Sequence, residues 1–172
     1  VGSEMCIRDR HWLMAILLIG MLLLGEDMME IEKEVGEDHG VGAFSFVSLH
    51  INLGMAILIL TVIRLAWRIA NPPPPLPETV KPWERKLAGL TYILFYVLMI
   101  GLPLTGWFAF PGFLAKNADV TGLSLFGVTE FPMAPAIPVK TIILHKLGSK
   151  IGLALLALHV LAALKHQFID DS

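Results

Sequence analysis

The side chains best suited to chemistry in this chain are histidines that stand inside apolar segments. Four of its six histidines do so, at His11, His50, His145 and His159. A titratable side chain inside a membrane-length apolar segment is costly to bury, which makes it a candidate functional residue by default. For any one of the four, a structural hydrogen bond to a neighbouring helix is a reasonable alternative. That alternative weakens when all four meet one geometric condition.

The geometric condition is helical spacing. His145 and His159 are 14 residues apart, close to four turns of α-helix, so both project from nearly one face and lie about 21 Å apart along the axis. His50, on the second apolar segment, lies at the depth of His145. His11, on the first segment, lies at the depth of His159. The spacing therefore predicts two histidine pairs at two depths of one bundle.

Paired histidines without a neighbouring carboxylate or thiolate favour haem as the ligand. Zinc normally takes four protein ligands, or three and a water in a catalytic site. Covalent c-type haem needs a Cys-x-x-Cys-His motif, which the sequence does not contain. Two facing imidazoles suit bis-histidine haem b. We therefore expect two haem b groups, the outer haem iron held by His50 and His145 and the inner haem iron by His11 and His159.

Three basic residues have spacings that suit the carboxylates of haem. Arg64 is 14 residues after His50 and so shares its helical stripe at the depth of the inner haem, where a guanidinium can hold a carboxylate through two hydrogen bonds. An interfacial anchor with no ligand is the alternative for Arg64. Lys146 and Lys150 stand beside His145, where they would meet outer-haem propionates or attract a small anion. A solvated helix end is the alternative for both lysines.

Four apolar segments must position these residues, at 11–25, 43–67, 87–110 and 141–164. A membrane span needs about 20 mostly apolar residues, so the first segment is short and the other three are long enough. The chain is 55% hydrophobic and only 16% charged, whereas a soluble domain carries about 25% charged residues. The sequence thus predicts an all-α fold, an integral membrane four-helix bundle formed as one domain by residues 11–172.

Charge and cysteine content exclude other classes of protein. The net charge of −2 excludes a basic nucleic-acid binder. One cysteine excludes a disulfide framework and any zinc or iron–sulfur site held only by cysteines of this chain.

The linkers between the apolar segments differ in character. The first, residues 26–42, is strongly acidic, and the second contains a proline run at residues 72–75 that cannot be helical. The third, residues 111–140, is rich in glycine and proline, and we expect it to lie along the membrane surface or to cap the bundle. Lysine and arginine counts of six on one side and five on the other decide orientation poorly. Arg64 and Arg68, flanking Trp67, favour cytoplasmic termini.

Residues 1–10 have no hydrophobic period and resemble the translation of a sequencing adapter from a transposon end. We expect them to be a non-native leader that takes no part in the fold. A short polar cytoplasmic tail is the alternative. On the leader interpretation Cys6, the only cysteine, is not native.

Several motifs together resemble those of the bacterial cytochrome b561 family. They cover nearly all of residues 11–172 in the order of the family, and each alone is weak. The matching stretches are His11-Trp12-Leu13, Leu49-His50-Ile51-Asn52-Leu53-Gly54, Val62-Ile63-Arg64-Leu65-Ala66-Trp67-Arg68 with the proline linker after it, Leu102-Pro103-Leu104-Thr105-Gly106, Leu144-His145-Lys146 and Leu158-His159.

The resemblance implies four helices, two b haems on the same four histidines, and a multi-pass protein of the bacterial inner membrane with both termini in the cytoplasm. Members of the family pass electrons between a small donor and the quinone pool, and some oxidise superoxide and reduce ubiquinone. The implied partners are ubiquinone, a small periplasmic donor, membrane lipid and a redox protein. This chain departs from many relatives at Tyr92, where they carry a histidine, and a quinone or propionate contact is expected to differ there.

Two functions remain open from the sequence. The first is a free-standing oxidoreductase that carries electrons from a periplasmic donor, superoxide among the candidates, to ubiquinone. The second is a haem-b membrane anchor that relays electrons within a larger dehydrogenase or hydrogenase. A gene for a catalytic subunit beside this one would favour the second.

Overall fold

The computed structural model describes residues 11–25, 46–72, 81–116, 121–135, 137 and 140–168. Three predictions lie outside this part of the chain: the non-native leader at residues 1–10, the acidic linker at 26–42, and the proline run, of which only Pro72 is described.

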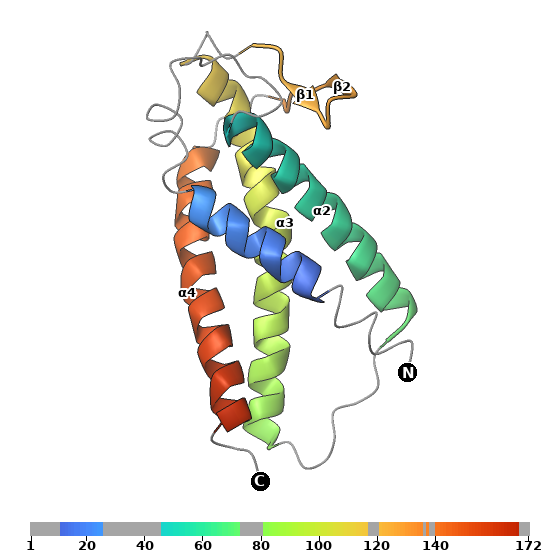
Figure 1. The fold of residues 1–172 in the computed structure, drawn as a ribbon, viewed down its shortest axis with the longest axis vertical. Coiled ribbons are helices and arrows are strands. Elements are labelled where there is room, and N and C mark those ends of the chain that lie inside the picture. The colour runs from blue at the N-terminus through green and yellow to red at the C-terminus, as the bar shows by residue number, and fades with distance from the viewer. Residues whose placement is uncertain are drawn as a thin grey trace.

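Helices dominate the described residues (Figure 1). They are a helix at His11–Gly25, α2 at Phe46–Ala70, α3 at Pro82–Leu114 and α4 at Thr141–Phe168. By length and composition α2, α3 and α4 can each cross a membrane, whereas His11–Gly25 is apolar but shorter. The predicted all-α membrane bundle of four helices is therefore confirmed, with three of the four long enough to span.

The largest error in the predicted boundaries is at the start of α3, which begins five residues before the apolar segment does. Pro82 occupies the first helical position, where its missing N–H removes no hydrogen bond. The backbone N–H of Lys81 donates to Oε2 of Glu84 at 3.3 Å, which satisfies a donor that the helix leaves open. Hydropathy does not report this polar first turn, because capping rather than burial makes it helical.

A small hairpin in the third linker was not predicted. β1 (Ser124–Leu125) and β2 (Thr129–Glu130) are antiparallel, and the turn between them closes through the N–H of Val128 on the carbonyl of Leu125 at 3.0 Å. Phe126 and Gly127 have φ of 53° and 72°, and positive φ at both central residues is typical of a type I′ turn. The usual signal for such a turn is Asn-Gly, which this sequence lacks, and a phenylalanine in this conformation is rare.

α3 is the central helix, and the main helix contacts run between α2 and α3 and between α3 and α4. The His11–Gly25 helix crosses the bundle obliquely (Figure 1) and packs into its core. The buried cluster there joins three residues of that helix with one of α2 and two of α3: Met14, Leu18, Leu22, Ile57, Tyr96 and Met99.

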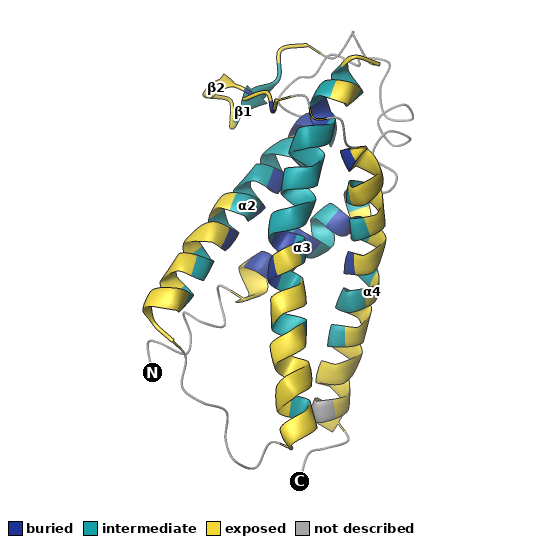
Figure 2. Cartoon of the chain, turned by 180° about the vertical axis from the view of Figure 1, so that it is seen from behind, coloured by how far each residue is buried: buried dark blue, intermediate teal, exposed yellow. Residues whose placement is uncertain are grey.

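The two ends of the bundle are buried to different degrees. We call the end that carries β1 and β2 the hairpin end. There α2 and α3 are largely buried or half-buried, whereas the opposite half of α3 and most of α4 are exposed (Figure 2). The exposed side chains on these helices are mainly large and apolar, which suits a surface that faces lipid.

Candidate cofactor site

The first predicted histidine pair comes together near the hairpin end. The imidazole rings of His50, on α2, and His145, on α4, have centres 6.0 Å apart and planes inclined by 77°. Both rings line a cavity of about 570 Å³ between the helices, within the range of about 300–1,000 Å³ usual for ligand pockets. The rest of the lining is mostly apolar and includes residues of the His11–Gly25 helix, α2, α3 and α4.

His145 is oriented by the backbone of α3. Its Nδ1 lies 2.9 Å from the carbonyl oxygen of Leu102 and 3.3 Å from the hydroxyl of Thr105. A carbonyl only accepts, so the N–H of the imidazole is assigned to Nδ1 and Nε2 keeps its lone pair. A histidine that binds a metal through one nitrogen commonly donates the other N–H to a carbonyl in this way.

Gly106 makes the close approach of His145 to α3 possible. A Cβ atom at Gly106 would lie 3.0 Å from Cε1 and 3.2 Å from Nδ1 of His145, tighter than almost any real contact of a Cβ. The absence of a side chain therefore lets the ring reach the Leu102 carbonyl.

His50 is half-buried, and its Nδ1 has no hydrogen-bond partner among the described residues. Gly25 stands beside it, since a Cβ atom there would lie 3.4 Å from Cε1 of His50. A buried polar atom without a partner is unusual. Nδ1 of His50 is thus left without a partner by the part of the chain that the structure describes.

The geometry of the pair fits one metal atom between two imidazoles. A bond of about 2.0–2.1 Å from a ring nitrogen to a metal on each side places the two ring centres about 6 Å apart. Among the described residues, no three side chains of His, Cys, Asp or Glu gather to hold an ion, so any metal here has only two ligands from that part of the chain. A metal that brings its own planar ring of ligands, as haem does, completes such a set.

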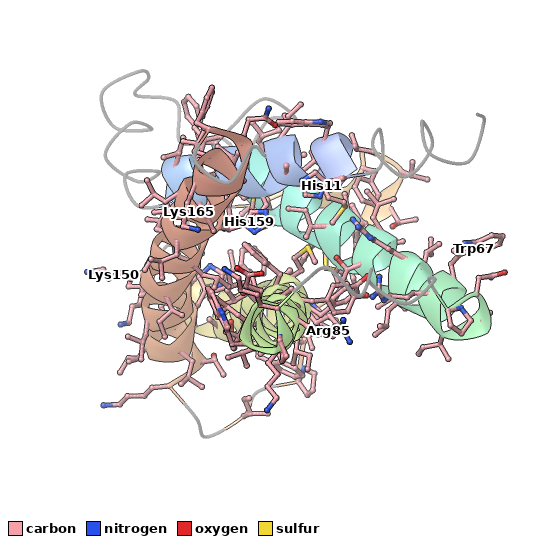
Figure 3. All side chains as sticks on the ribbon, turned by 90° about the horizontal axis from the view of Figure 1, so that it is seen from below. His11, Trp67, Arg85, Lys150, His159 and Lys165 are labelled. Carbon is pink, nitrogen blue, oxygen red and sulfur yellow. The ribbon has the colours of Figure 1, made fainter. Side chains whose placement is uncertain are left out.

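The second predicted pair also comes together. His11, at the start of the first helix, and His159, on α4, have ring centres 6.3 Å apart and planes inclined by 53° (Figure 3). Phe95 of α3 packs edge-on against His159, with ring centres 5.3 Å apart. His11 is exposed and His159 half-buried, so this pair is more open than the first.

Arg64 lies near this second pair, half-buried on α2. Its charge acts on both His11 and Tyr92, which places it within electrostatic reach of the predicted inner site. Arg68, one turn further on, contacts α3. Its guanidinium carbon lies 3.8 Å from the centre of the Tyr92 ring, a cation–π contact, and Tyr92 in turn packs on Tyr96 at 4.7 Å.

Lys146 and Lys150 are exposed and line the cavity that holds His50 and His145. Lys146 and Lys150 are therefore in reach of a haem bound in this cavity and of a small anion that approaches it. The side chains of the two remaining histidines, His39 and His166, lie outside the described residues.

Sequence reasoning missed the residues that cover the first cavity. Nδ2 of Asn52 donates to the carbonyl of Ser124 at 3.1 Å, and the N–H of Phe126 donates to Oδ1 of Asn52 at 2.6 Å. On α3, Nε1 of Trp107 donates to the carbonyl of Pro132 at 2.7 Å. These hydrogen bonds fix both sides of the segment 121–135, which we call the cap.

The cap reaches the cavity through Phe131. This ring is buried, lines the cavity and packs on Phe110 of α3 with ring centres 5.3 Å apart. Asn52 was the available signal, because a polar amide inside an apolar helix needs a partner. Nothing in the pattern indicated that the partner is a hairpin more than 70 residues further along the chain.

Comparisons with known proteins show what the chain is similar to. The family model for prokaryotic cytochrome b561 matches residues 7–172. Cytochrome b561 homolog 2 of Escherichia coli strain K12 is 32% identical over 165 residues, which cover 93% of this chain and 81% of that protein. Cytochrome b562 of Cereibacter sphaeroides is 32% identical over 63% of this chain and 72% of its own length. A probable superoxide oxidase, CybB, of Yersinia pestis is 27% identical over 70% of this chain and 67% of its own length.

Proposed function

Because this chain belongs to the prokaryotic cytochrome b561 family, we propose that it holds two b haems and carries electrons from a periplasmic donor to ubiquinone. The resemblance noted from the sequence is confirmed, and membership makes the protein a membrane cytochrome that transfers electrons and uses haem b. The number of haems, the ligands, the donor and the direction are the proposal.

The observation that carries the haem assignment is the separation of the two ring pairs. At 6.0 and 6.3 Å between ring centres, each pair matches two imidazoles bonded to one iron. His50 and His145 are proposed to hold the haem at the hairpin end, and His11 and His159 the other. When bound, each haem supplies a carrier for one electron.

The chain's own residues give the two sites different tasks. The Leu102 carbonyl fixes the tautomer of His145 and makes Nε2 a stronger donor. The cap and its Phe131 ring keep water from one side of the first site. At the second site, Arg64 is placed to hold a carboxylate with its guanidinium fork. An interfacial anchor remains the alternative for Arg64.

We assign the hairpin end to the periplasm and both termini to the cytoplasm of the inner membrane. Lys146 and Lys150 at the opening of the cavity would attract a small anion by their field. Superoxide is such an anion, and one relative bears the name of a probable superoxide oxidase. Two superoxide anions would each lose one electron and become O₂, while one ubiquinone would take both electrons and two protons and become ubiquinol.

The haem proposal is tested by measuring pyridine-haemochrome spectra of the purified protein. We expect two b haems per chain, and one after His145→Ala. The matched control is His39→Ala, which changes a histidine outside the proposed ligand set and should keep both haems. A wild-type protein that contains one haem or none, or a His145→Ala variant that retains two, contradicts the proposal.

The donor is tested by stopped-flow mixing of superoxide with the oxidised protein in liposomes that contain ubiquinone. Rapid haem reduction is expected, slowed about tenfold by Lys146→Glu with Lys150→Glu and unchanged by Lys165→Glu at the other end of α4. If superoxide reduces no haem, the donor is a different molecule. Copurification of a dehydrogenase or hydrogenase subunit would then favour the anchor role.

A further inference from the structure

The tip of the β1–β2 hairpin exposes two apolar side chains. Phe126 is 50% and Val128 82% exposed. In a turn with positive φ at both central residues, asparagine, aspartate or glycine ordinarily takes the first of them, yet Phe126 stands there with φ of 53°. Because this backbone conformation is unfavourable for phenylalanine, its presence indicates that the Phe126 side chain has a function.

The depth of this tip follows from its attachment to α2. Phe126 is bonded through its N–H to Asn52 at 2.6 Å, and Asn52 is six residues after Phe46, the first residue of a helix long enough to span the membrane. At 1.5 Å per residue, Asn52 is about 9 Å from that end. The 25 residues of α2 extend only about 4 Å beyond each side of a 30 Å hydrocarbon core. The reach of one amide side chain therefore places Phe126 near the boundary between acyl chains and headgroups.

The tip also continues a surface that already faces lipid. Leu49, one turn before Asn52 on α2, is 41% exposed, and further along the helix Ile59, Val62 and Ile63 are exposed too. Figure 1 shows the hairpin projecting sideways at the start of α2, and not lying over the axis of the bundle. Phe126 and Val128 thus extend the apolar side of α2 outward at the level of the membrane surface.

The charge of the cap favours lipid over a protein partner. Glu130 is the only charged residue between positions 121 and 135, and it lies on β2 opposite Ser124, away from the turn. A surface that selects one protein usually adds complementary charges to its apolar centre. An apolar tip without charge, at the height of the acyl-chain boundary, matches the interfacial region of a bilayer.

We propose that the hairpin is a membrane anchor, with Phe126 and Val128 inserted into the interfacial region of the leaflet at the hairpin end. Asn52 and Trp107 attach the cap to the helices, and the inserted tip attaches it to the lipid. The cap is then held from both sides over the cavity of His50 and His145. The proposal depends on α2 crossing the membrane and not on the assignment of haem to the histidine pairs.

The experiment uses nitroxide spin labels on the full, haem-loaded protein in lipid nanodiscs. Cys6 is replaced by serine, and one cysteine is introduced in Phe126→Cys, Val128→Cys or, as the matched control in the same segment, Thr121→Cys. Power saturation compares the access of oxygen, which concentrates in lipid, with that of a water-soluble nickel chelate. Labels at 126 and 128 should favour oxygen, and the label at 121 should favour the nickel complex.

Two results would overturn the anchor. Labels at 126 and 128 that are as accessible to the nickel complex as the label at 121 would show that the tip stands in water. Protection from both reagents would show that protein covers it, either a second copy or a partner.

A second variant separates the role of the side chain from that of the turn. Phe126→Asn suits the turn better than the native residue, so the hairpin should persist, but the ring is lost. The label at Val128→Cys should then become severalfold more accessible to the nickel complex, whereas Phe126→Trp should keep its lipid-like ratio. Unchanged accessibility after Phe126→Asn, with the helix and haem spectra of the parent, contradicts the proposal.

Discussion

The two histidine pairs are alike in ring separation, at 6.0 and 6.3 Å, and unlike in their surroundings. At the hairpin end, a backbone carbonyl orients His145, glycines at 25 and 106 stand against the rings, and the cap covers the cavity. Toward the other end, His11 is exposed and the neighbouring contacts are aromatic and cationic. One helix, α4, carries a histidine of each pair, so the surroundings and not the histidines themselves distinguish the two pairs.

This contrast bears on the direction of electron transfer in the proposed function. A site lined mostly by apolar side chains and a site near arginine side chains stabilise the charge of a bound group differently. The following predictions take the proposed haem at each histidine pair as their premise. Each alters one side of the contrast and leaves the other as an internal control.

The largest effect is expected from closing the space at Gly106. In Gly106→Ala the new Cβ would stand 3.0 Å from the His145 ring and push it away from the Leu102 carbonyl. Changes to the partners of a metal-ligating histidine typically weaken metal binding 10- to 100-fold, so we expect about tenfold weaker retention of the haem at the hairpin end. Haem titration of the apoprotein measures this.

The control for that change is Gly101→Ala on the same helix, where a Cβ atom would have no neighbour within 4 Å. In Gly101→Ala both haems should bind as tightly as in the unsubstituted protein. Parental binding in Gly106→Ala as well would mean that the close approach of His145 is not needed.

A smaller effect is expected from releasing the cap. Asn52→Ala removes two hydrogen bonds to the hairpin, which should lower the free energy of unfolding by about 1–2 kcal/mol. Water admitted past Phe131 should shift the midpoint potential of the hairpin-end haem to more negative values, because water stabilises the charged ferric form. Redox titration should find the other haem unchanged.

Asn71→Ala is the matched control, since Asn71 is an exposed asparagine just past the opposite end of α2, and its side chain donates to the Trp67 carbonyl and not to the hairpin. Asn71→Ala should change the midpoint potential of neither haem. Equal shifts of both haems in Asn52→Ala would show a general loosening of the bundle and not the loss of a local cap.

The smallest effect concerns the opposite end. Arg68→Ala removes the guanidinium that lies 3.8 Å from the Tyr92 ring, which should cost about 0.5–1 kcal/mol of stability. A double-mutant cycle with Tyr92→Leu isolates this contact. A coupling energy near zero would mean that the Arg68–Tyr92 contact does not stabilise the protein. A change in the midpoint potential of the hairpin-end haem would contradict the independence of the two sites.

The spacing of the histidines was predictable because it depends on one helix at a time. A separation of 14 residues on α4 places two rings on one face whatever surrounds the helix. The apolar segments likewise predicted the helices, since a span must satisfy its own backbone. The start of α3 at Pro82 was missed because a capped polar turn leaves no hydropathy signal.

A cap formed by the third linker was one of the two placements expected from the sequence, but the way it is attached was not predictable, for a different reason. Its hydrogen bonds join Asn52 to a turn more than 70 residues away, and the turn itself carries phenylalanine where asparagine is usual. The position of Arg68 beside Trp67 is visible in the sequence and favoured cytoplasmic termini, whereas its contact with Tyr92 depends on how α2 packs on α3.

The sequence by itself determined the apolar helices and the shared face of His145 and His159, because these follow from local composition and helical periodicity. Its motifs indicated the family by resemblance. Only the tertiary structure decided which site is enclosed, which carbonyl orients His145 and what covers the cavity. Those features depend on distances between side chains from separate helices, and packing sets these distances to within a few tenths of an ångström.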